Sequence, residues 1–274
     1  MTETFSVAMC TYNGARFVSD QLESIAAQTR IPDELVVCDD ASSDNTAAIV
    51  ETFANRVPFL VRLYVNDVNL GSTKNFQQAI SLCEGDLIAL ADQDDIWLSE
   101  KLARLGKEFA KSPSPGLVFS DAEVGDEEGR SLGQGMWESI GIQGSELDRL
   151  RAGKALGDLL LGATVTGTTA AFRARYRELV LPLPEHLPLI HDAWIALLIG
   201  CVADIEPVED RLVLHGDAQV VDDPLKSLML AAFVKRPAGV PEGEWPGLVE
   251  QATSAYRQNV AVAFRRLHTF LTDE

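Results

Sequence analysis

Apolar and polar positions alternate in blocks along the first 125 residues of the chain. Short apolar runs, of the kind that form buried parallel strands, alternate with segments whose apolar residues recur at helical spacing. The pattern predicts strands at residues 5–12, 34–40, 59–66, 86–92 and 116–124, and helices at residues 15–28, 45–55, 72–83 and 99–111. Such alternation is typical of an α/β fold with a doubly wound, mostly parallel sheet and helices on both faces.

Three of the predicted helices start beside a hydroxyl side chain. Thr46 lies close to the start of the second helix, and Ser72 and Ser99 open the third and fourth. Serine is among the preferred N-cap residues, because its oxygen accepts a hydrogen bond from an unpaired backbone N–H group of the first turn. We therefore expect Ser72 and Ser99 to act as N-caps.

The second half of the chain has a weaker pattern. Residues 127–157 are polar and rich in glycine, which predicts a loop region over the sheet. Further elements are expected as a strand at 164–173, a helix at 191–202 and a last strand at 210–217 that ends at His215. Residues 234–247 contain three prolines and three glycines, as a linker does. The helix predicted at 248–271 offers five side chains for packing: Ala252, Ala255, Val262, Phe264 and Leu267.

Polar side chains follow three of the predicted strands at the point where each strand ends. The first strand is followed by Thr11, Tyr12, Asn13 and Gly14, the second by Asp39 and Asp40, and the fourth by Asp92, Gln93, Asp94 and Asp95. Ligands of parallel α/β sheets bind at the carboxyl ends of the strands. We expect these three segments to meet at one rim of the sheet.

The acidic run at residues 92–95 has two interpretations. Asp92 and Asp94 are spaced so that both can reach one divalent cation, and Mg²⁺ and Mn²⁺ favour one or two carboxylates together with phosphate oxygens. Alternatively, Asp94 and Asp95 start the helix that follows, where the helix dipole favours negative charge. The triplet alone does not decide between a metal site and a helix start.

The composition and the net charge of the chain argue against one class of function. The chain has 274 residues, 46% of them hydrophobic and 23% charged, which is ordinary for a globular protein with a real core. Its net charge of −18 argues against a general nucleic-acid binder, which needs a basic face. Residues 225–274 carry six Lys or Arg against five Asp or Glu, so this extension differs from the acidic body at residues 1–224.

Cysteine usage and hydropathy suggest a cellular location. The four cysteines are scattered without a Cys-x-x-Cys pair, so we expect free thiols, with Cys10, Cys38 and Cys83 buried. No basic-then-apolar leader opens the sequence, and no apolar stretch approaches the roughly 20 residues that span a bilayer. We expect a cytoplasmic protein. Its C-terminal helix either packs on the body, which is the commonest outcome, or dimerises, or rests on the inner face of the membrane.

Several ordered motifs resemble those of family 2 glycosyltransferases. The motifs are "VAMCTYNGARFVSDQLESIAAQT", "PDELVVCDDASSDNT", "NLGSTKNFQQAI" and "GDLIALADQDDIWLSEKL", followed by "VTGTTAAFR", "LPLPEHLPLIHDAWIALL" and "LVLHGD". The later motifs are similar to those of bacterial rhamnosyltransferase-like members. The resemblance implies a GT-A fold with a nucleotide-sugar-binding half at residues 1–122, an acceptor half at 123–224 and a C-terminal helical extension at 225–274. It also implies an inverting sugar transfer that depends on Mg²⁺ or Mn²⁺.

The resemblance assigns a role to each residue of the rim. Thr11, Tyr12 and Asn13 would line the pocket of the base. Asp40 would accept a hydrogen bond from the base, supported by Asp39, while Lys74 and Asn75 would approach the donor. Asp92 would face the ribose and the metal, Asp94 would be the principal metal ligand, and His215 would close the site beside the metal.

The resemblance also supplies a general base. Asp192, in "HDAW", matches the acidic residue that deprotonates the acceptor hydroxyl, although its position before an apolar helix equally suits a helix cap. His191 is expected to be a structural neighbour, and Trp97 and Trp194 either stack on a sugar or pack in the core. The sequence departs from related ones at two places. Ala193 replaces an aromatic residue beside the proposed base, which concerns the acceptor, and the Asn that follows the histidine in related sequences is missing after His215, which concerns the contacts of the final loop. Neither change touches the metal or base positions.

These observations predict an enzyme that transfers rhamnose or a similar hexose from a dTDP- or UDP-sugar to a bacterial glycan or a lipid-linked acceptor. The alternative is a non-catalytic sugar-nucleotide-binding or scaffolding subunit, against which the presence of Asp192 argues. A sugar nucleotidyltransferase is disfavoured because no Gly-rich basic loop follows the first strand. A dinucleotide-binding enzyme is disfavoured because that position has no G-x-G-x-x-G motif.

Overall fold

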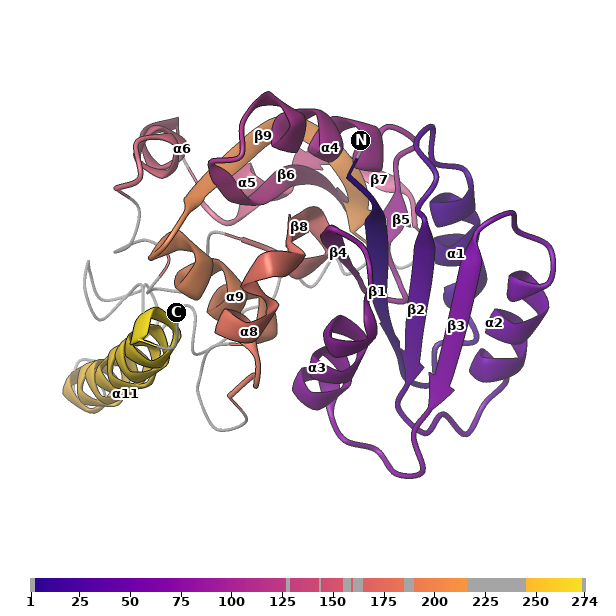
Figure 1. Cartoon of the computed structure of the whole chain (residues 1–274), viewed down its shortest axis with the longest axis horizontal. Coiled ribbons are helices and arrows are strands. Elements are labelled where there is room, and N and C mark those ends of the chain that lie inside the picture. Colours follow the sequence, from indigo (N-terminus) through magenta and orange to yellow (C-terminus); the bar gives the residue numbers. More distant parts are fainter. Residues whose placement is uncertain are drawn as a thin grey trace.

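The computed structural model describes residues 3–126, 129–142, 144–154, 159, 165–184, 190–215 and 245–272. One curled sheet runs through the protein, and its main path has the strand order β3-β2-β1-β4-β8-β6-β9-β5, with β7 paired to β6 outside that path (Figure 1). Helices cover both faces of the sheet, as the sequence pattern predicted.

The first half of the sheet is parallel. It contains β1 (Phe5–Thr11), β2 (Glu34–Asp39), β3 (Leu60–Val65) and β4 (Leu87–Ala91), connected through α1 (Val18–Ala26), α2 (Thr46–Ala54) and α3 (Ser72–Leu82). Strands β1, β2 and β4 are buried along their whole length, which explains their continuous apolar sequence. The strand and helix predictions for this half are confirmed.

Two apolar clusters form the core, one on each face of the sheet. One face packs against α1, α2 and α4 (Lys101–Lys111), through side chains such as Leu22, Phe53 and Leu105. The other face packs against α3 and α9 (His191–Gly200), through Phe76, Ile80 and Trp194. The apolar helix α9 is buried on nearly all sides, and for this reason its sequence shows no polar face.

The second half of the sheet is mixed rather than parallel. Strand β8 (Ala170–Arg173) inserts between β4 and β6 (Pro115–Gly125) and is antiparallel to both, whereas β6 pairs in parallel with β9 (Asp204–His215). The short β5 (Ile96–Trp97) lies antiparallel to β9. These strands pair with segments that are distant along the chain. The spacing of apolar residues in the sequence does not predict such pairing.

Two predictions for the second half were wrong in detail. The segment at 127–157, expected to be a loop region, contains β7 (Ser131–Gly135), α5 (Met136–Ser139) and α6 (Gly144–Arg151) among its described residues. These elements are short but bury Met136, Trp137 and Leu150. The strand expected at 164–173 is shorter: a 3₁₀ turn, η1 (Gly167–Thr169), precedes β8, and η2 (Ala174–Tyr176) with α8 (Arg177–Val180) follows it.

Both predicted serine caps were also wrong. The N-cap residues of α3 and α4 are Gly71 and Glu100, and neither helix start has a side-chain cap hydrogen bond. Ser99 instead offers its backbone oxygen to the backbone N–H of Thr29, at 2.9 Å. At the start of α4, the first-turn N–H of Leu102 instead donates to Gln28 Oε1, from a distant segment, at 3.0 Å.

The C-terminal helix α11 (Trp245–Thr272) lies beside α8 and α9 (Figure 1). Ala263 is buried, Val262 and Leu267 pack against the core, and Arg266 Nε donates to Leu179 O at 2.9 Å. Phe264, expected to pack, is 70% exposed. Most of the predicted linker lies outside the described residues. Among those that are described, no helix combines the length and apolarity needed to cross a membrane.

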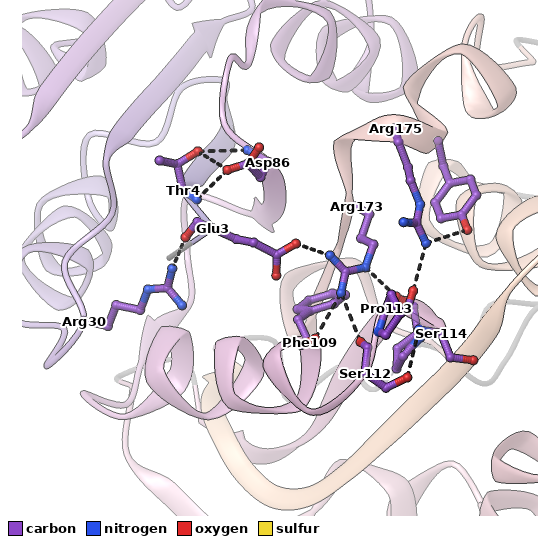
Figure 2. Close-up of polar contacts among 12 residues, drawn as sticks. Glu3, Thr4, Arg30, Asp86, Phe109, Ser112, Pro113, Ser114, Arg173 and Arg175 are labelled. Carbon is purple, nitrogen blue, oxygen red and sulfur yellow. Dashed lines mark hydrogen bonds and ion pairs between the residues drawn. The ribbon is translucent and has the colours of Figure 1, made fainter. Parts of the chain in front are cut away.

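A buried arginine connects several elements at the edge of the sheet where β1 and β4 begin (Figure 2). Arg173, at the end of β8, donates to Pro115 O and Phe109 O at 3.0 Å and to Ser112 O at 3.2 Å, and pairs with Glu3. Two of these acceptors lie at the C-terminal end of α4, where unpaired carbonyl oxygens favour a cation. The opposite edge of the sheet carries the polar rim.

Candidate active site

The ends of β1, β2 and β4 meet at one edge of the sheet, as predicted. Thr11 lies opposite Asp39 in the β1–β2 ladder, and Met9 lies opposite Ala91 in the β1–β4 ladder. Asp92 is therefore the first residue beyond the strand next to β1. Parallel pairing without a register shift brings the three polar segments to a common rim.

Asp39 and Asp40 are both buried and saturated with hydrogen bonds. Asp39 accepts from Thr11 Oγ1 at 2.7 Å, and from Ser42 through its N–H and its hydroxyl. Asp40 accepts from Asn66 Nδ2 at 2.9 Å and from the backbone N–H groups of Leu70 and Gly71 at 2.8 Å. Both carboxylates thus hold the loops around the predicted base pocket in place. Their predicted contact with the base remains a prediction.

Tyr12 and Asn13 line the rim from the loop after β1. Tyr12 is 48% exposed, and Gln93 clamps its backbone: Tyr12 N donates to Gln93 Oε1 at 2.8 Å, and Gln93 Nε2 donates to Tyr12 O at 3.0 Å. Asn13, with a φ of 46°, accepts from Ser43 N at 2.8 Å. Gln93 was missed from the sequence, since a glutamine between aspartates carries no signal for a backbone clamp.

Lys74 and Asn75 belong to the first turn of α3. Asn75 is buried and joins two neighbours, donating to Cys38 O at 2.7 Å and accepting from Asn66 Nδ2 at 3.0 Å. Lys74 lines a cleft between α3, α8 and α11, together with Arg177 and Arg266. The structure therefore brings Asn75 to the base of the rim, whereas Lys74 lines the cleft beside α8 and α11.

Asp92 is a buried carboxylate of the rim with a strongly shifted pKa. Burial, together with repulsion from Asp95 and Asp94, raises its pKa to about 8, and His215 only partly offsets this. The charge of Asp192 also raises the pKa of Asp92, so the predicted general base lies near the acidic triplet. Buried carboxylates that repel one another are stabilised in their charged form by a cation, so this perturbation marks Asp92 as a candidate ligand.

Asp95 does not cap the following helix, contrary to one of the two interpretations of the acidic run. It is buried, precedes β5, and its Oδ1 lies 2.6 Å from His215 Nδ1. Burial lowers the pKa of His215, but the hydrogen bond to Asp95 and the charges of Asp95, Asp92 and Asp94 outweigh burial and raise it to about 9. The protonated imidazole offsets part of the negative charge of the triplet.

Lys101 is a fully buried cation beneath the rim, and no sequence pattern singled it out. Its Nζ donates to Thr168 O at 2.6 Å and lies 3.1 Å from the centroid of the Trp97 ring. Burial lowers its pKa well below the ordinary value, although Asp95 and Asp92 act in the opposite direction. Lys101 links the acidic triplet to the turn η1.

The turn η1 also holds the predicted general base. Gly167 N donates to Asp192 Oδ2 at 2.8 Å, and a Cβ on Gly167 would lie 3.2 Å from both Asp192 Cβ and His191 Nε2. Asp192 is buried in the first turn of α9, where its Oδ1 also accepts from Ala193 N. A side chain at position 167 would therefore press on the base and on His191.

Other predicted neighbours turn out to be structural. His191 is buried, stacks on Phe76 with ring centroids 3.9 Å apart, and has its pKa lowered by burial. Trp97 and Trp194 are both buried, and Trp194 Nε1 donates to Val180 O at 3.0 Å, so neither presents its ring to a sugar. Cys10, Cys38 and Cys83 are buried free thiols, as expected.

The side chains at the rim fit a divalent cation. Carboxylate oxygens and one imidazole nitrogen suit Mg²⁺ or Mn²⁺, and Asp95 Oδ2 is buried without a hydrogen-bond partner among the described residues. Across the described ranges, no three His, Cys, Asp or Glu side chains gather in a geometry that could hold a metal. Mg²⁺ is usually held by one or two carboxylates together with phosphate oxygens of the substrate, and such a site needs no protein cage.

Comparison with curated proteins finds bacterial relatives of the N-terminal half. The chain is 37% identical over 119 residues to a dTDP-rhamnosyl transferase of Shigella flexneri, covering 42% of this chain and 38% of that protein. It is 36% identical over 97 residues to the UDP-Glc:alpha-D-GlcNAc-diphosphoundecaprenol beta-1,3-glucosyltransferase of Escherichia coli, covering 35% and 37%. The chain thus spans less than half the length of these relatives.

Solved structures share the fold over most of the chain. S. aureus TarS in complex with UDP superposes with a TM-score of 0.61 at 20% identity, covering 91% of this chain and 70% of that chain. The mannosyltransferase PcManGT of Pyrobaculum calidifontis, in complex with GDP-Man and Mn²⁺, has a TM-score of 0.61 at 20% identity, covering 100% and 76%. The predicted GT-A fold is confirmed. The model of glycosyl transferase family 2 matches residues 6–180, well over half of the sequence, and the chain therefore belongs to glycosyl transferase family 2.

Proposed function

We propose that this protein is an inverting, divalent-metal-dependent glycosyltransferase that moves rhamnose or a similar hexose from a dTDP- or UDP-sugar to a bacterial glycan or lipid-linked acceptor. One observation supports this above all others: the charges of Asp95, Asp94, His215 and Asp192 all act on Asp92. This proximity supports a cation site and a general base at one rim.

The donor class follows from the names of related proteins. The Shigella relative is a dTDP-rhamnosyl transferase, and the E. coli relative is named for UDP-Glc and alpha-D-GlcNAc-diphosphoundecaprenol. Structural neighbours were solved with UDP, UDP-GlcNAc or GDP-Man and Mn²⁺. In this chain the base would lie against Thr11, Tyr12 and Asn13, next to the loops that Asp39 and Asp40 hold. Lys74 and Asn75 would border the donor from α3.

The proposed reaction is a single displacement. Asp192 takes the proton of the acceptor hydroxyl while the acceptor oxygen bonds to the anomeric carbon. The bond from that carbon to the diphosphate oxygen breaks on the opposite face, which inverts the configuration. Asp92, Asp94 and His215 do not form a preformed cage, but they would bind a divalent cation together with phosphate oxygens of the donor, and the cation would supply positive charge to the leaving diphosphate. Gly167 N–H holds Asp192 Oδ2, which keeps the base in a fixed orientation.

A screen of nucleotide-sugars tests the proposal. Purified protein is incubated with dTDP- and UDP-sugars plus Mg²⁺ or Mn²⁺, and release of nucleoside diphosphate is measured without acceptor and with lipid-linked or polysaccharide acceptors. We expect slow hydrolysis without acceptor and faster release with the correct acceptor. Asp94→Ala should lose metal-dependent release while remaining folded.

The matched control is Glu51→Ala, which removes an exposed carboxylate from α2. It should retain wild-type release. A wild-type rate unaffected by chelator would exclude metal dependence. Tight donor binding without turnover across a broad acceptor panel would instead favour the scaffolding alternative.

A further inference from the structure

Asp95 and His215 face each other across two paired strands. Strand β5 pairs with β9 in the register Ile96 to Leu214 and Trp97 to Val213. Continuing this antiparallel register by one residue places Asp95 opposite His215, and their side chains meet with Nδ1 and Oδ1 2.6 Å apart. The pair is therefore a cross-strand pair set by the ladder.

The hydrogen bonding of Asp95 differs from that of the other buried carboxylates of the rim. Asp39 and Asp40 each accept three hydrogen bonds, spread over both oxygens. Asp95 has a side chain that is 0% exposed, one contact to His215, and an Oδ2 without a hydrogen-bond partner in the described part of the chain. A buried carboxylate that served only the fold would be expected to have both oxygens satisfied. The one hydrogen bond of Asp95 in the described part of the chain is to the histidine, and the buried Lys101 interacts electrostatically with the same carboxylate.

A carboxylate on one ring nitrogen determines what the other nitrogen can do. The carboxylate holds the proton on Nδ1 and so fixes the orientation of the ring, and a metal ion binds Nε2 by displacing the proton there. His215 is 24% exposed at the end of β9 and acts electrostatically on Asp92, a proposed cation ligand. In this arrangement Nδ1 is hydrogen-bonded to Asp95, and Nε2 is the ring nitrogen left to contact the cation.

We propose that Asp95 is a positioning residue that holds His215 through Nδ1, so that Nε2 is presented to the divalent cation of the donor complex. This inference rests on the proposed function. It separates the roles within the acidic triplet: Asp92 and Asp94 face the cation directly, whereas Asp95 acts through the imidazole.

Calorimetric titration with Mn²⁺ in the presence of UDP provides the first test. Outer-shell partners of metal-ligating histidines typically contribute about 10- to 100-fold to metal affinity, so Asp95→Asn should weaken Mn²⁺ binding by about that factor. Asp210→Asn is the matched control: it removes a carboxylate from β9, the strand of His215, where Asp210 is 52% exposed and pairs with Arg104, and it should leave affinity unchanged. Because Asp95 acts through His215, the double variant Asp95→Asn/His215→Gln should bind Mn²⁺ no more weakly than His215→Gln alone.

Nitrogen NMR of the histidine rings in metal-free wild-type protein provides the second test and does not depend on activity. The chain has four histidines, and the His215→Gln spectrum identifies the signal of interest. We expect a hydrogen-bonded proton on Nδ1 in the wild type, which is absent from Asp95→Asn. A ring that is not hydrogen-bonded at Nδ1, additive effects in the double variant, or unchanged Mn²⁺ affinity in Asp95→Asn would each overturn the inference.

The two proposals fail in different ways. A wild-type protein that binds neither UDP nor any nucleotide-sugar contradicts the proposed function, and the NMR signal still reports whether Asp95 holds the ring. A wild-type protein that binds UDP but no Mn²⁺ overturns the role of Nε2.

Discussion

Gly14 lies directly against the side chain of Gln93. A Cβ at position 14 would stand 2.0 Å from Gln93 Oε1 and 2.5 Å from its Cδ, closer than any real contact allows. The same Gln93 amide clamps the backbone of Tyr12 through two hydrogen bonds. The absence of a side chain at Gly14 therefore lets the end of β4 hold the loop after β1, where the base is proposed to bind.

Gly14→Ala is expected to displace Gln93, release the Tyr12 loop and weaken UDP binding. Overpacking should lower the free energy of unfolding by about 1 to 2 kcal/mol, since the clash falls on a side chain that can move. Calorimetry with UDP and denaturant unfolding measure the two effects.

Gly144→Ala is the control, because a Cβ there has no heavy atom within 4 Å. Adding Gln93→Ser should restore stability but not UDP affinity, and unchanged UDP affinity in Gly14→Ala would contradict the proposed role of the clamp.

Asp92→Asn is expected to stabilise the metal-free protein while abolishing metal-dependent release. The pKa of Asp92 is raised from 3.8 to about 8 in the fold. As the pH rises from about 4 to about 8, the unfolded chain ionises this group before the folded chain does, so the carboxylate increasingly destabilises the fold. The gain in melting temperature on substitution should therefore be larger at about pH 8 than at about pH 5.

Thermal unfolding in chelator at the two pH values measures this gain. Asp67→Asn, which changes an exposed carboxylate, should show little effect at either pH. A melting temperature of Asp92→Asn that falls below wild type at the higher pH would show that the carboxylate stabilises the metal-free fold.

Glu34→Gln is expected to destabilise the protein at neutral pH. Burial alone would raise the pKa of Glu34, but the N–H of Glu84, the Ser6 hydroxyl and Arg62 together hold it below the ordinary value. A depressed folded-state pKa stabilises the fold above the unfolded pKa, and this stabilisation is lost as the pH falls through the folded pKa. We expect a loss of about 2 kcal/mol at neutral pH, typical of a hydrogen-bonded charge.

Denaturant unfolding from about pH 7 down to about pH 3 should show the difference between wild type and Glu34→Gln shrinking below about pH 4, where unfolded glutamates become protonated. Glu84→Gln, which removes the exposed partner of Arg62, is the control and should change stability little. A pH-independent difference would assign the effect to packing instead of charge.

Arg173→Met should destabilise the protein by about 3 kcal/mol, because it leaves Glu3 unpaired and removes the donor for three backbone carbonyls. Arg175→Met, two residues away, removes an exposed guanidinium that donates to Pro113 O at 2.9 Å (Figure 2). It should change the free energy of unfolding by no more than about 0.5 kcal/mol. Equal losses in the two variants would show that the buried contacts of Arg173 contribute no more than a surface contact.

Local sequence pattern was sufficient to predict the first half of the fold and the position of the rim. Strands β1, β2 and β4 are buried throughout, so their apolar runs are unambiguous, and parallel pairing necessarily brings their carboxyl ends to one edge. For that reason the order of strands and helices along the chain already implies that Thr11, Asp39, Asp40 and Asp92 lie together.

Which polar residues act on one another depends instead on contacts between distant segments. Asp95 has the local pattern of a helix start, but its partner His215 lies 120 positions away along the chain. Gln93 and Lys101 reach Tyr12 and Thr168, which lie 81 and 67 positions away. Helical and strand periodicity arises from neighbours within a few residues, whereas the contacts of Asp95 and Lys101 depend on the register of β5 on β9 and on the insertion of β8 into the sheet. A local sequence pattern does not contain that register, because long-range pairing is selected by the packing of the whole sheet.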